Sequence, residues 1–245
     1  MPWLLVDNSN TRTKFALGNH EGLADNHFWL PTNELTPQIL ATELDGLHFQ
    51  GALLCSVVPK TAAILHSYLG PRGPVHSLTH ESDTGLSIDY PNPEQIGADR
   101  LANAIGVAHH HATPAIVIDF GTAVTFDVVG IGPTYCGGVI APGLGAMQDY
   151  LGQKTALLPK IELAEPRAAI GKSTVEAMQA GAVFGYRGLI REIIGRLREE
   201  MQGDPLVVAT GGDAALIARG LPEIHRVDPG LTLEGIRLAA VRNLR

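Results

Sequence analysis

Two aspartates, Asp7 and Asp119, each end a short apolar run and are followed by small or polar residues. Residues 4–6 form the first run and residues 116–118 the second, so the two patterns lie 112 residues apart. An aspartate in this position suits a phosphate or metal site, because the N–H groups of a tight turn converge on phosphate oxygens while the carboxylate holds a cation or its water ligands. One such turn is weak support. Two at matching positions indicate a site that holds one nucleotide from both sides.

Each aspartate belongs to a predicted β-hairpin. In the first hairpin, the polar turn Asn8-Ser9-Asn10 separates apolar residues 3–7 from a β-compatible run at residues 11–17. Residues 120–126 keep small or polar types in register with residues 8–14. Either two buried hairpins match by coincidence, or the chain contains a duplicated domain. We favour duplication and predict two α/β domains, at residues 1–112 and 113–245.

The elements that must position these turns follow from the apolar periodicity. We expect a helix after Pro37, a buried strand within residues 51–58 and a helix at residues 98–108 with its apolar side chains on one face. In the second half we expect strands at residues 134–140 and 206–209 and a closing helix at residues 233–244. Ser173 and Glu176 have the spacing of a capping box, which predicts a helix start at Ser173.

Composition and charge argue against several classes of protein. Lys plus Arg number 18 and Asp plus Glu number 25, and the net charge of −7 predicts no basic surface for nucleic acid. The apolar runs are far too short to cross a bilayer, and the N-terminus does not have the pattern of a signal peptide. The two cysteines, Cys55 and Cys136, have no paired spacing, so we expect no disulfide framework and a cytoplasmic protein.

The two aspartate turns resemble the phosphate-binding motifs of the acetate-kinase, sugar-kinase and actin superfamily. Within it, the segment YPNPEQIGADR at residues 90–100 resembles the substrate motif of type III pantothenate kinases, in which GADR carries the catalytic base. Further matches are DFGTAVT at residues 119–125, GGVIAPG at 137–143 and GKST at 171–174. The resemblance runs in order through nearly the whole chain. It implies two duplicated actin-like (ribonuclease H-like) α/β domains with ATP in the cleft between them, and ATP-dependent phosphorylation of pantothenate.

Phosphoryl transfer to an alcohol needs a carboxylate near the hydroxyl, a cation at the phosphates and firm positioning. Asp99 is the candidate general base, although its spacing alone equally fits a carboxylate favoured by a helix N-terminus. Arg100 would hold the carboxylate of the substrate in a bidentate pair, whereas without the resemblance it fits a surface ion pair. The resemblance implies a pantothenate site made of Tyr90, Gly97, Ala98, Asp99, Arg100 and Thr174.

The resemblance also implies an ATP site and its cations. Asp7 would organise Mg²⁺ through water, Asp119 would hold a monovalent cation (K⁺ or NH₄⁺), and Asn10 and Thr122 would meet the phosphates. It further implies a homodimer in which the second subunit partly encloses pantothenate, with no nucleic acid or membrane partner. The predicted ATP-binding residues are Asp7, Asn8, Ser9, Asn10, Thr11, Arg12, Thr13, Lys14 and Thr122.

One position departs from the family pattern. The first motif of the family is usually DxGNT, whereas residues 7–11 read DNSNT, so Ser9 replaces a glycine. The added Cβ lies where the phosphates should approach and restricts positive φ, so we expect weakened nucleotide binding. Two alternatives stay open: a non-catalytic regulatory homologue that binds nucleotide or pantothenate, and another small-molecule kinase on the same fold.

Overall fold

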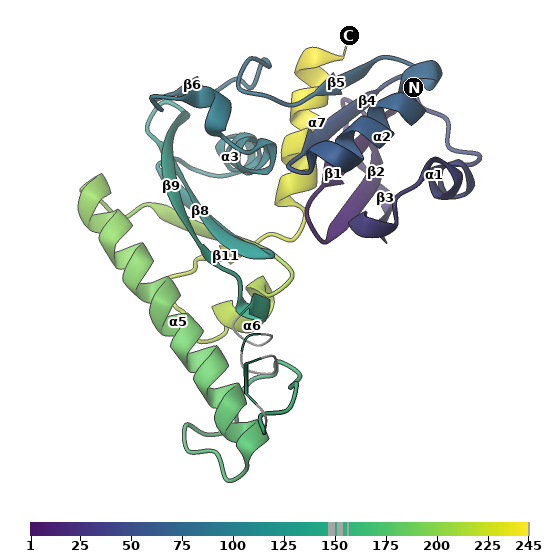
Figure 1. Ribbon diagram of the computed structural model, residues 1–245. Helices are drawn as coiled ribbons and strands as arrows, with labels where there is room; N and C mark the ends of the chain where they lie inside the picture. Colours follow the sequence, from purple (N-terminus) through teal and green to yellow (C-terminus); the bar gives the residue numbers. More distant parts are fainter. Residues whose placement is uncertain (147–149, 151–153, 156, 245) are drawn as a thin grey trace. The chain divides into compact units, whose positions relative to one another are not determined.

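The computed structural model describes the chain except for residues 147–149, 151–153, 156 and 245 (Figure 1). By its internal contacts the chain forms two compact units. Unit 1 comprises Met1–Ala112, Ile131–Cys136 and Gly230–Arg245, and unit 2 comprises Thr113–Gly130 and Gly137–Pro229. The contacts therefore group a short internal segment and the C-terminal helix with the first unit, and the domain division at 112/113 stays a prediction.

Unit 1 is built on a five-stranded sheet in the order β3-β2-β1-β4-β5. Its central strand β1 (Trp3–Asn8) is buried along its whole length, pairs antiparallel with β2 (Arg12–Gly18) and pairs parallel with β4 (Ala52–Ser56). The outer strands are β3 (Leu23–Pro31) and β5 (Val75–Ser77). The helices α1 (Pro37–Glu43) and α2 (Pro59–Leu69) both begin with a proline, whose fixed φ suits a first helical position. Three short 3₁₀ turns complete this part: η1 (Thr32–Glu34), η2 (Gly70–Arg72) and η3 (Pro93–Gln95).

Two further helices of unit 1 pack against each other. They are α3 (Ala98–His110), which confirms the helix expected at residues 98–108, and α7 (Leu231–Asn243). A Cβ at Gly235 would collide with the carbonyl of Ala102, so glycine is what allows the two backbones to approach this closely. Thr232 Oγ1 also donates to Asn103 Oδ1 at 2.8 Å inside this interface. Helix α7 contacts β1 and β4 as well, which holds the end of the chain in unit 1.

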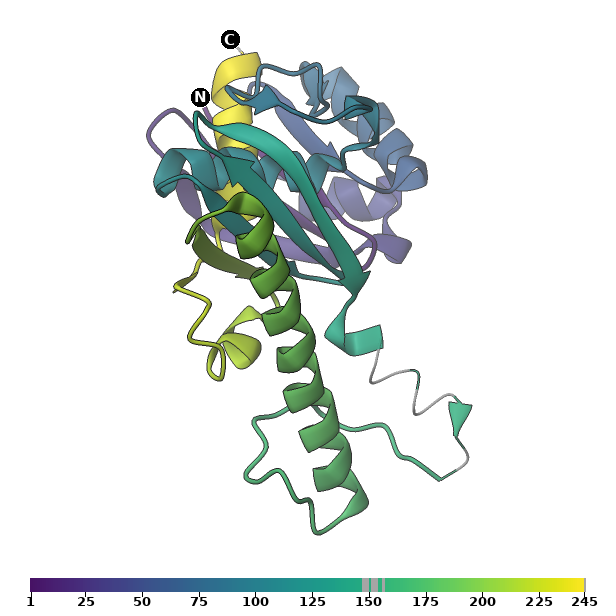
Figure 2. The ribbon, with the colours of Figure 1, turned by 90° about the vertical axis from the view of Figure 1, so that its left-hand side faces the viewer.

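The second sheet has six strands in the order β11-β10-β7-β8-β9-β6, and its first five repeat the arrangement of the first sheet. These five strands are β7 (Ala115–Phe120), β8 (Ala123–Gly130), β9 (Thr134–Pro142), β10 (Leu206–Gly211) and β11 (Arg226–Val227). The described helices of unit 2 include α5 (Thr174–Met201) and α6 (Ala214–Ala218). Figure 2 shows α5 as one uninterrupted helix. The predicted cap is present, because Ser173 Oγ accepts from Glu176 N at 3.2 Å. Glu176 itself accepts from Lys172 N, one residue before the position of a capping box.

The two sheets share one topology, which confirms the duplicated fold. β1 pairs antiparallel with β2 and parallel with β4, and β7 pairs antiparallel with β8 and parallel with β10. Asp7 and Asp119 each occupy the penultimate position of the central strand. The predicted equivalence of the two aspartates is therefore confirmed at the level of strand order and direction. Among the described residues, no helix is both long enough and apolar enough to span a membrane.

Candidate active site

The first aspartate is held by two hydrogen bonds from its own hairpin. Asp7 is 2% exposed, and the register of β1 and β2 places Lys14 directly opposite it. Lys14 Nζ lies 2.9 Å from Asp7 Oδ2, and Ser9 Oγ donates to Asp7 Oδ1 at 2.9 Å. Each carboxylate oxygen therefore has a donor. This arrangement fits a carboxylate that contacts Mg²⁺ through its water ligands, because Mg²⁺ usually keeps several waters in protein sites.

Ser9 does not have the backbone conformation that the family glycine suggested. Among the described non-glycine residues, positive φ occurs at Gln202, so Ser9 lies in the region that any L-residue adopts. The turn is fixed by Ser9 N, which donates to Arg12 O at 3.2 Å, and by Thr32 Oγ1, which donates to Ser9 O at 2.7 Å. The expectation that Ser9 restricts a positive φ is therefore wrong. The side chain instead supplies a donor to Asp7.

Asn8 and Thr13 face the interior. Asn8 Nδ2 donates to Thr13 Oγ1 at 2.7 Å, and Asn8 Oδ1 accepts from Ser56 Oγ at 2.7 Å and from Thr61 Oγ1 at 2.8 Å. These bonds tie β1 to β4 and α2. Successive side chains of a strand point to opposite faces, so Asn8 makes them on the face opposite to that of Asp7. Both side chains are buried, so an ATP contact at Asn8 or Thr13 would use backbone groups.

The other predicted ATP residues of the first hairpin surround its turn. Asn10, Thr11 and Arg12 are exposed, and the Arg12 guanidinium lies 4.3 Å from the ring centroid of Trp29. Stacking on the indole restrains the arginine while leaving it in solvent. These three residues are available at the turn, and their contact with ATP stays a prediction.

The GADR segment forms the first turn of α3. Gly97 is the N-cap, and a Cβ there would lie 2.6 Å from Asp99 Oδ1, so glycine leaves room for this carboxylate. Asp99 Oδ1 accepts from the backbone N–H of Arg100 at 2.8 Å, and the side chain is partly exposed. Residues 97 and 98 also line a cavity of about 520 Å³ at this helix start. Other residues on its wall are Ser56, Val57, Thr79, His80, Glu81 and Glu94.

Arg100 belongs to an aromatic cluster that sequence reasoning missed in part. The Arg100 guanidinium lies 5.8 Å from the ring centroid of Tyr135, and the predicted substrate residue Tyr90 meets the same ring edge-on, with centroids 6.3 Å apart. Arg100 is 8% exposed and Tyr135 is fully buried. Tyr135 lies at the start of β9, and nothing in its local pattern indicates that it meets residues so far away in sequence.

Unit 2 holds the second aspartate turn. A Cβ at Gly211, which has φ +91°, would lie 2.6 Å from Asp119 Oδ1, so glycine is needed where β10 ends beside this carboxylate. Thr122 is exposed in the turn between β7 and β8, and its carbonyl accepts from Gly143 N at 3.2 Å. The last predicted substrate residue, Thr174, is the exposed first residue of α5 and belongs to unit 2.

Two titratable groups near these turns have shifted pKa values. Burial raises the pKa of the carboxyl of Asp213, the residue that follows Gly212 and precedes α6. Burial, followed by the negative charge of Asp213, raises the pKa of the Tyr186 phenol. The phenol therefore stays neutral at physiological pH and donates to Pro142 O at 3.3 Å. Both groups belong to unit 2.

Among the described residues, no group of three or more His, Cys, Asp or Glu side chains gathers as a metal site. A cation would therefore need oxygen ligands from water, backbone or nucleotide in addition to a carboxylate. Mg²⁺ in kinases is commonly held this way, through one or two carboxylates plus substrate phosphates. The donor set at Asp7 fits that mode of binding.

Known proteins resemble this chain along its whole length. The family model described as type III pantothenate kinase matches residues 3–196. A type III pantothenate kinase of Akkermansia muciniphila is 55% identical over 244 residues, which cover 100% of both chains. One of Methylacidiphilum infernorum is 41% identical and covers 96% of this chain and 86% of the relative.

Solved structures support the same fold at lower identity. A conserved putative Baf family transcriptional activator from Campylobacter jejuni has a TM-score of 0.65 at 19% identity, with 97% of this chain and 96% of that chain covered. A putative 2-dehydro-3-deoxygalactonokinase from Sinorhizobium meliloti has a TM-score of 0.59 at 14% identity, with 97% and 98% covered. These likenesses concern the fold, and the family follows from the sequence matches. The chain belongs to the type III pantothenate kinase family.

Proposed function

We propose that this chain is a kinase that transfers the γ-phosphoryl group of ATP to the hydroxyl of pantothenate and forms 4′-phosphopantothenate, the first step of coenzyme A biosynthesis. The observation that carries this proposal is the first turn of α3, where the partly exposed Asp99 and the buried Arg100 directly follow Gly97 and Ala98, which line a cavity. The two relatives described above are named type III pantothenate kinase, and they match 100% and 96% of this chain. Neither a regulatory homologue nor another kinase is favoured by any feature of the site.

Asp99 acts as the general base in this proposal. The substrate hydroxyl donates to the Asp99 carboxylate, which takes the proton as the oxygen attacks phosphorus. Arg100 pairs with the carboxylate at the other end of pantothenate, and Tyr90, Gly97 and Ala98 line the site between them. Phosphoryl transfer often has a loose transition state, so positioning of the hydroxyl by Asp99 contributes in addition to proton removal.

The ATP phosphates lie against the two aspartate turns in this proposal. Asn10 and Thr122 contact them, Asp119 holds K⁺ or NH₄⁺, and Asp7 orients the water ligands of Mg²⁺. When bound, Mg²⁺ neutralises charge on the phosphates. Lys14 orients the buried carboxylate of Asp7 through their 2.9 Å contact.

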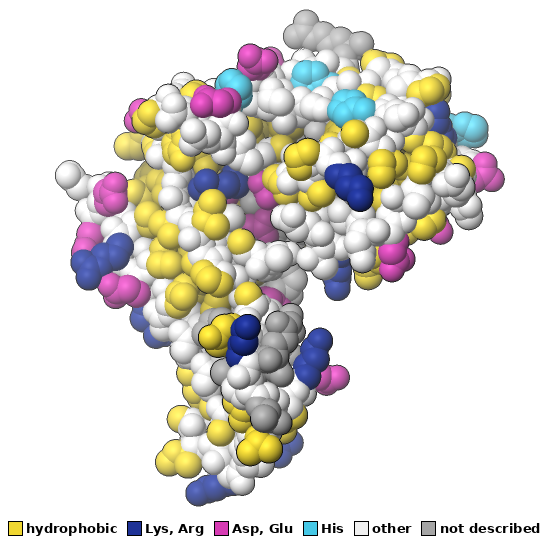
Figure 3. All heavy atoms as spheres, viewed as in Figure 1, with side chains coloured by type: hydrophobic (Ala, Val, Ile, Leu, Met, Phe, Trp, Pro, Cys, Tyr) yellow, Lys and Arg dark blue, Asp and Glu magenta, His cyan; other side chains and the backbone are white. Residues whose placement is uncertain are grey.

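We also propose a cytoplasmic homodimer that uses the exposed side of α5. Figure 3 shows apolar side chains on the face that carries this helix, and Val175 and Phe184 are 42% and 40% exposed. A groove of about 870 Å³ runs beside it, lined by Pro142, Leu158, Ile161, Thr174, Ala177 and Met178. Exposed apolar side chains and an apolar groove are typical of a protein interface. The second subunit would bring residues to the pantothenate site, among which we place Thr174.

The test is an assay of the purified chain with ATP, Mg²⁺ and K⁺, with and without pantothenate. Formation of phosphopantothenate, detected by mass spectrometry together with ADP, is the expected result. ADP release that depends on a different acceptor would identify another kinase. Binding of ATP and pantothenate in calorimetry without product would identify a non-catalytic homologue, and Asp99→Asn serves as the control for background phosphorylation.

A further inference from the structure

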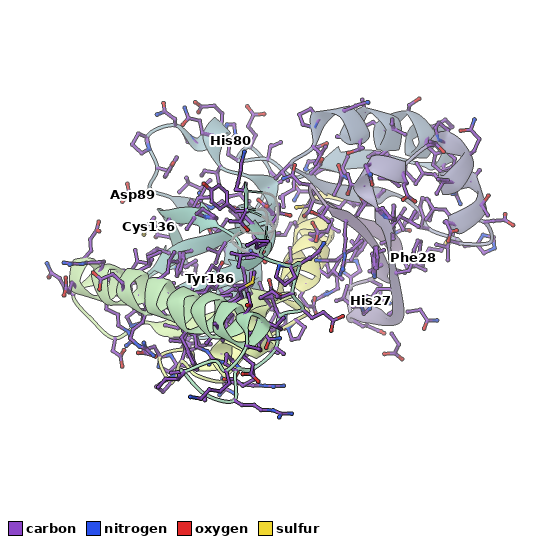
Figure 4. All side chains as sticks on the ribbon, turned by 60° about the horizontal axis from the view of Figure 1, so that its bottom comes forward. His27, Phe28, His80, Asp89, Cys136 and Tyr186 are labelled. Carbon is purple, nitrogen blue, oxygen red and sulfur yellow. The ribbon has the colours of Figure 1, made fainter. Side chains whose placement is uncertain are left out.

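The strand pairing of unit 1 brings Tyr135 to the substrate residues. β6 (Ser87–Ile88) pairs parallel with the start of β9, with Ile88 opposite Tyr135. Two backbone bonds fix this pairing: Ser87 N donates to Pro133 O at 3.0 Å and Asp89 N donates to Tyr135 O at 2.9 Å. Figure 4 shows Asp89 and Cys136 close together where the two strands meet. Tyr90 is the second residue after β6, and its ring meets that of Tyr135.

The ring of Tyr135 also lies beside the Arg100 guanidinium. The guanidinium carbon lies 5.8 Å from the ring centroid, within the distance at which a cation is attracted to an aromatic face. Arg100 is 8% exposed and Tyr135 fully buried, and this attraction is stronger when both groups are removed from water. A guanidinium can grip a carboxylate with two parallel bonds only when its plane is held in a suitable orientation. The ring of Tyr135 supplies one surface for that orientation.

We propose that Tyr135 is a positioning residue that holds the Arg100 guanidinium and thereby sets the preference of this kinase for an acceptor that carries a carboxylate. This inference rests on the proposed function of the site. Tyr135 itself touches neither reacting group. Its effect is confined to the end of the acceptor where the carboxylate lies, and the hydroxyl that is phosphorylated lies at the other end.

The experiment compares pantothenate with pantothenol, in which a neutral hydroxymethyl group replaces the carboxylate. Tyr135→Leu should lower kcat/KM for pantothenate about 2- to 30-fold more than for pantothenol, chiefly by raising KM. This range of fold-changes corresponds to the free energy of attraction between an aromatic ring and a cation. Tyr135→Phe keeps the ring face and should retain the preference for pantothenate. In an Arg100→Ala background, Tyr135→Leu should have no further effect on the preference.

A second series keeps the shape of the side chain, so that it stays informative if Tyr135→Leu does not fold. Site-specific replacement of Tyr135 by phenylalanine with increasing numbers of fluorine atoms weakens the negative face of the ring in steps, and KM for pantothenate should rise with each step. Equal losses of kcat/KM for both acceptors, or a KM for pantothenate that does not change with fluorination, would overturn the proposal. A wild-type protein that phosphorylates neither acceptor would instead overturn the proposed function, which separates the two failures.

Discussion

Ser9 offers the sharpest test of how the first turn works, because the structure removes one reason for the weakened nucleotide binding expected from the sequence. The family glycine suggested that serine hinders nucleotide binding, whereas Ser9 Oγ donates to Asp7 Oδ1 at 2.9 Å in a backbone conformation that does not need glycine. Two substitutions separate the contributions. Ser9→Ala removes the hydroxyl alone, and Ser9→Gly removes the hydroxyl and also loosens the turn.

The magnitude follows from burial. A hydrogen bond to a charged group contributes about 1.5–3 kcal/mol, but Ser9 is only partly buried, so water can replace part of the hydroxyl and the loss should be about 1 kcal/mol. Lys14 still holds the other oxygen of Asp7 at 2.9 Å. We therefore expect KM for Mg-ATP to rise about 5-fold in Ser9→Ala, with kcat little changed. Ser9→Gly should add about 0.5–1 kcal/mol from the more flexible backbone.

Steady-state kinetics at varied ATP and Mg²⁺, with calorimetric binding of ATP in the absence of metal, distinguish the possible roles of the hydroxyl. If Ser9 acts through Asp7 and the metal waters, binding of metal-free ATP should be the same in wild type and Ser9→Ala. An equal loss without metal would mean that the hydroxyl contacts phosphate directly. A lower KM or a higher kcat in Ser9→Gly would refute the reasoning and restore the view that serine impairs this turn.

Three further perturbations test other parts of the molecule. Asp99→Asn should lower kcat by about 10²–10⁴-fold with little change in pantothenate binding, and full activity in the folded variant would exclude Asp99 as the base. Replacing K⁺ by Na⁺ at constant ionic strength should lower turnover strongly if Asp119 helps to hold the larger ion, whereas equal rates would remove that role. Arg187→Ala should destabilise unit 2 by about 2–4 kcal/mol in urea unfolding, because Arg187 is 5% exposed and pairs with Glu165 at 2.6 Å. The hydrogen bond from Arg187 lowers the pKa of Glu165, so the stabilisation by the ionised Glu165 is present above its ordinary pKa near 4.5 and is lost as pH falls through the lowered value. Glu165→Gln should remove this pH dependence of the unfolding free energy. A pH profile of unfolding that is the same in Glu165→Gln and wild type would contradict this role of Glu165.

Local pattern predicted the elements that carry the turns, because their signals lie within a few residues. The apolar run at residues 4–6 and the polar turn after it predict the hairpin of β1 and β2, and the run at residues 116–118 predicts β7 in the same way. The apolar periodicity predicted the helix at residues 98–108, which the structure confirms as α3. In each case the burial of alternate side chains or the start of a helix determines the local conformation.

The local sequence pattern could not predict contacts between segments that lie far apart in the chain. Tyr135 meets Arg100 and Tyr90 only because β6 pairs with the start of β9, and neither strand signals its partner. The closing helix was expected, but its packing against α3 depends on Gly235, whose need for space is visible only with Ala102 in place. The conformation of Ser9 was misjudged because a family glycine was taken to mean positive φ, although its missing side chain can matter on its own.

The two copies share more than their strand order, because each supports its aspartate turn in the same way. This shared support explains part of the family motif found at residues 137–143. In unit 1, Thr32 follows the proline that ends β3, and its N–H donates to Thr11 O at 3.1 Å. In unit 2, Gly143 follows the proline that ends β9, and its N–H donates to Thr122 O at 3.2 Å. The third strand of each sheet therefore ends by bracing the turn between the first two. Unit 1 adds a side-chain bond from Thr32 Oγ1 to Ser9 O at 2.7 Å, whereas in unit 2 any Cβ at Gly143 would collide with the turn carbonyls. The shared brace is thus a backbone bond, which a hydroxyl supplements in one copy and which only a bare backbone permits in the other. The shared topology therefore needs little shared sequence at this position.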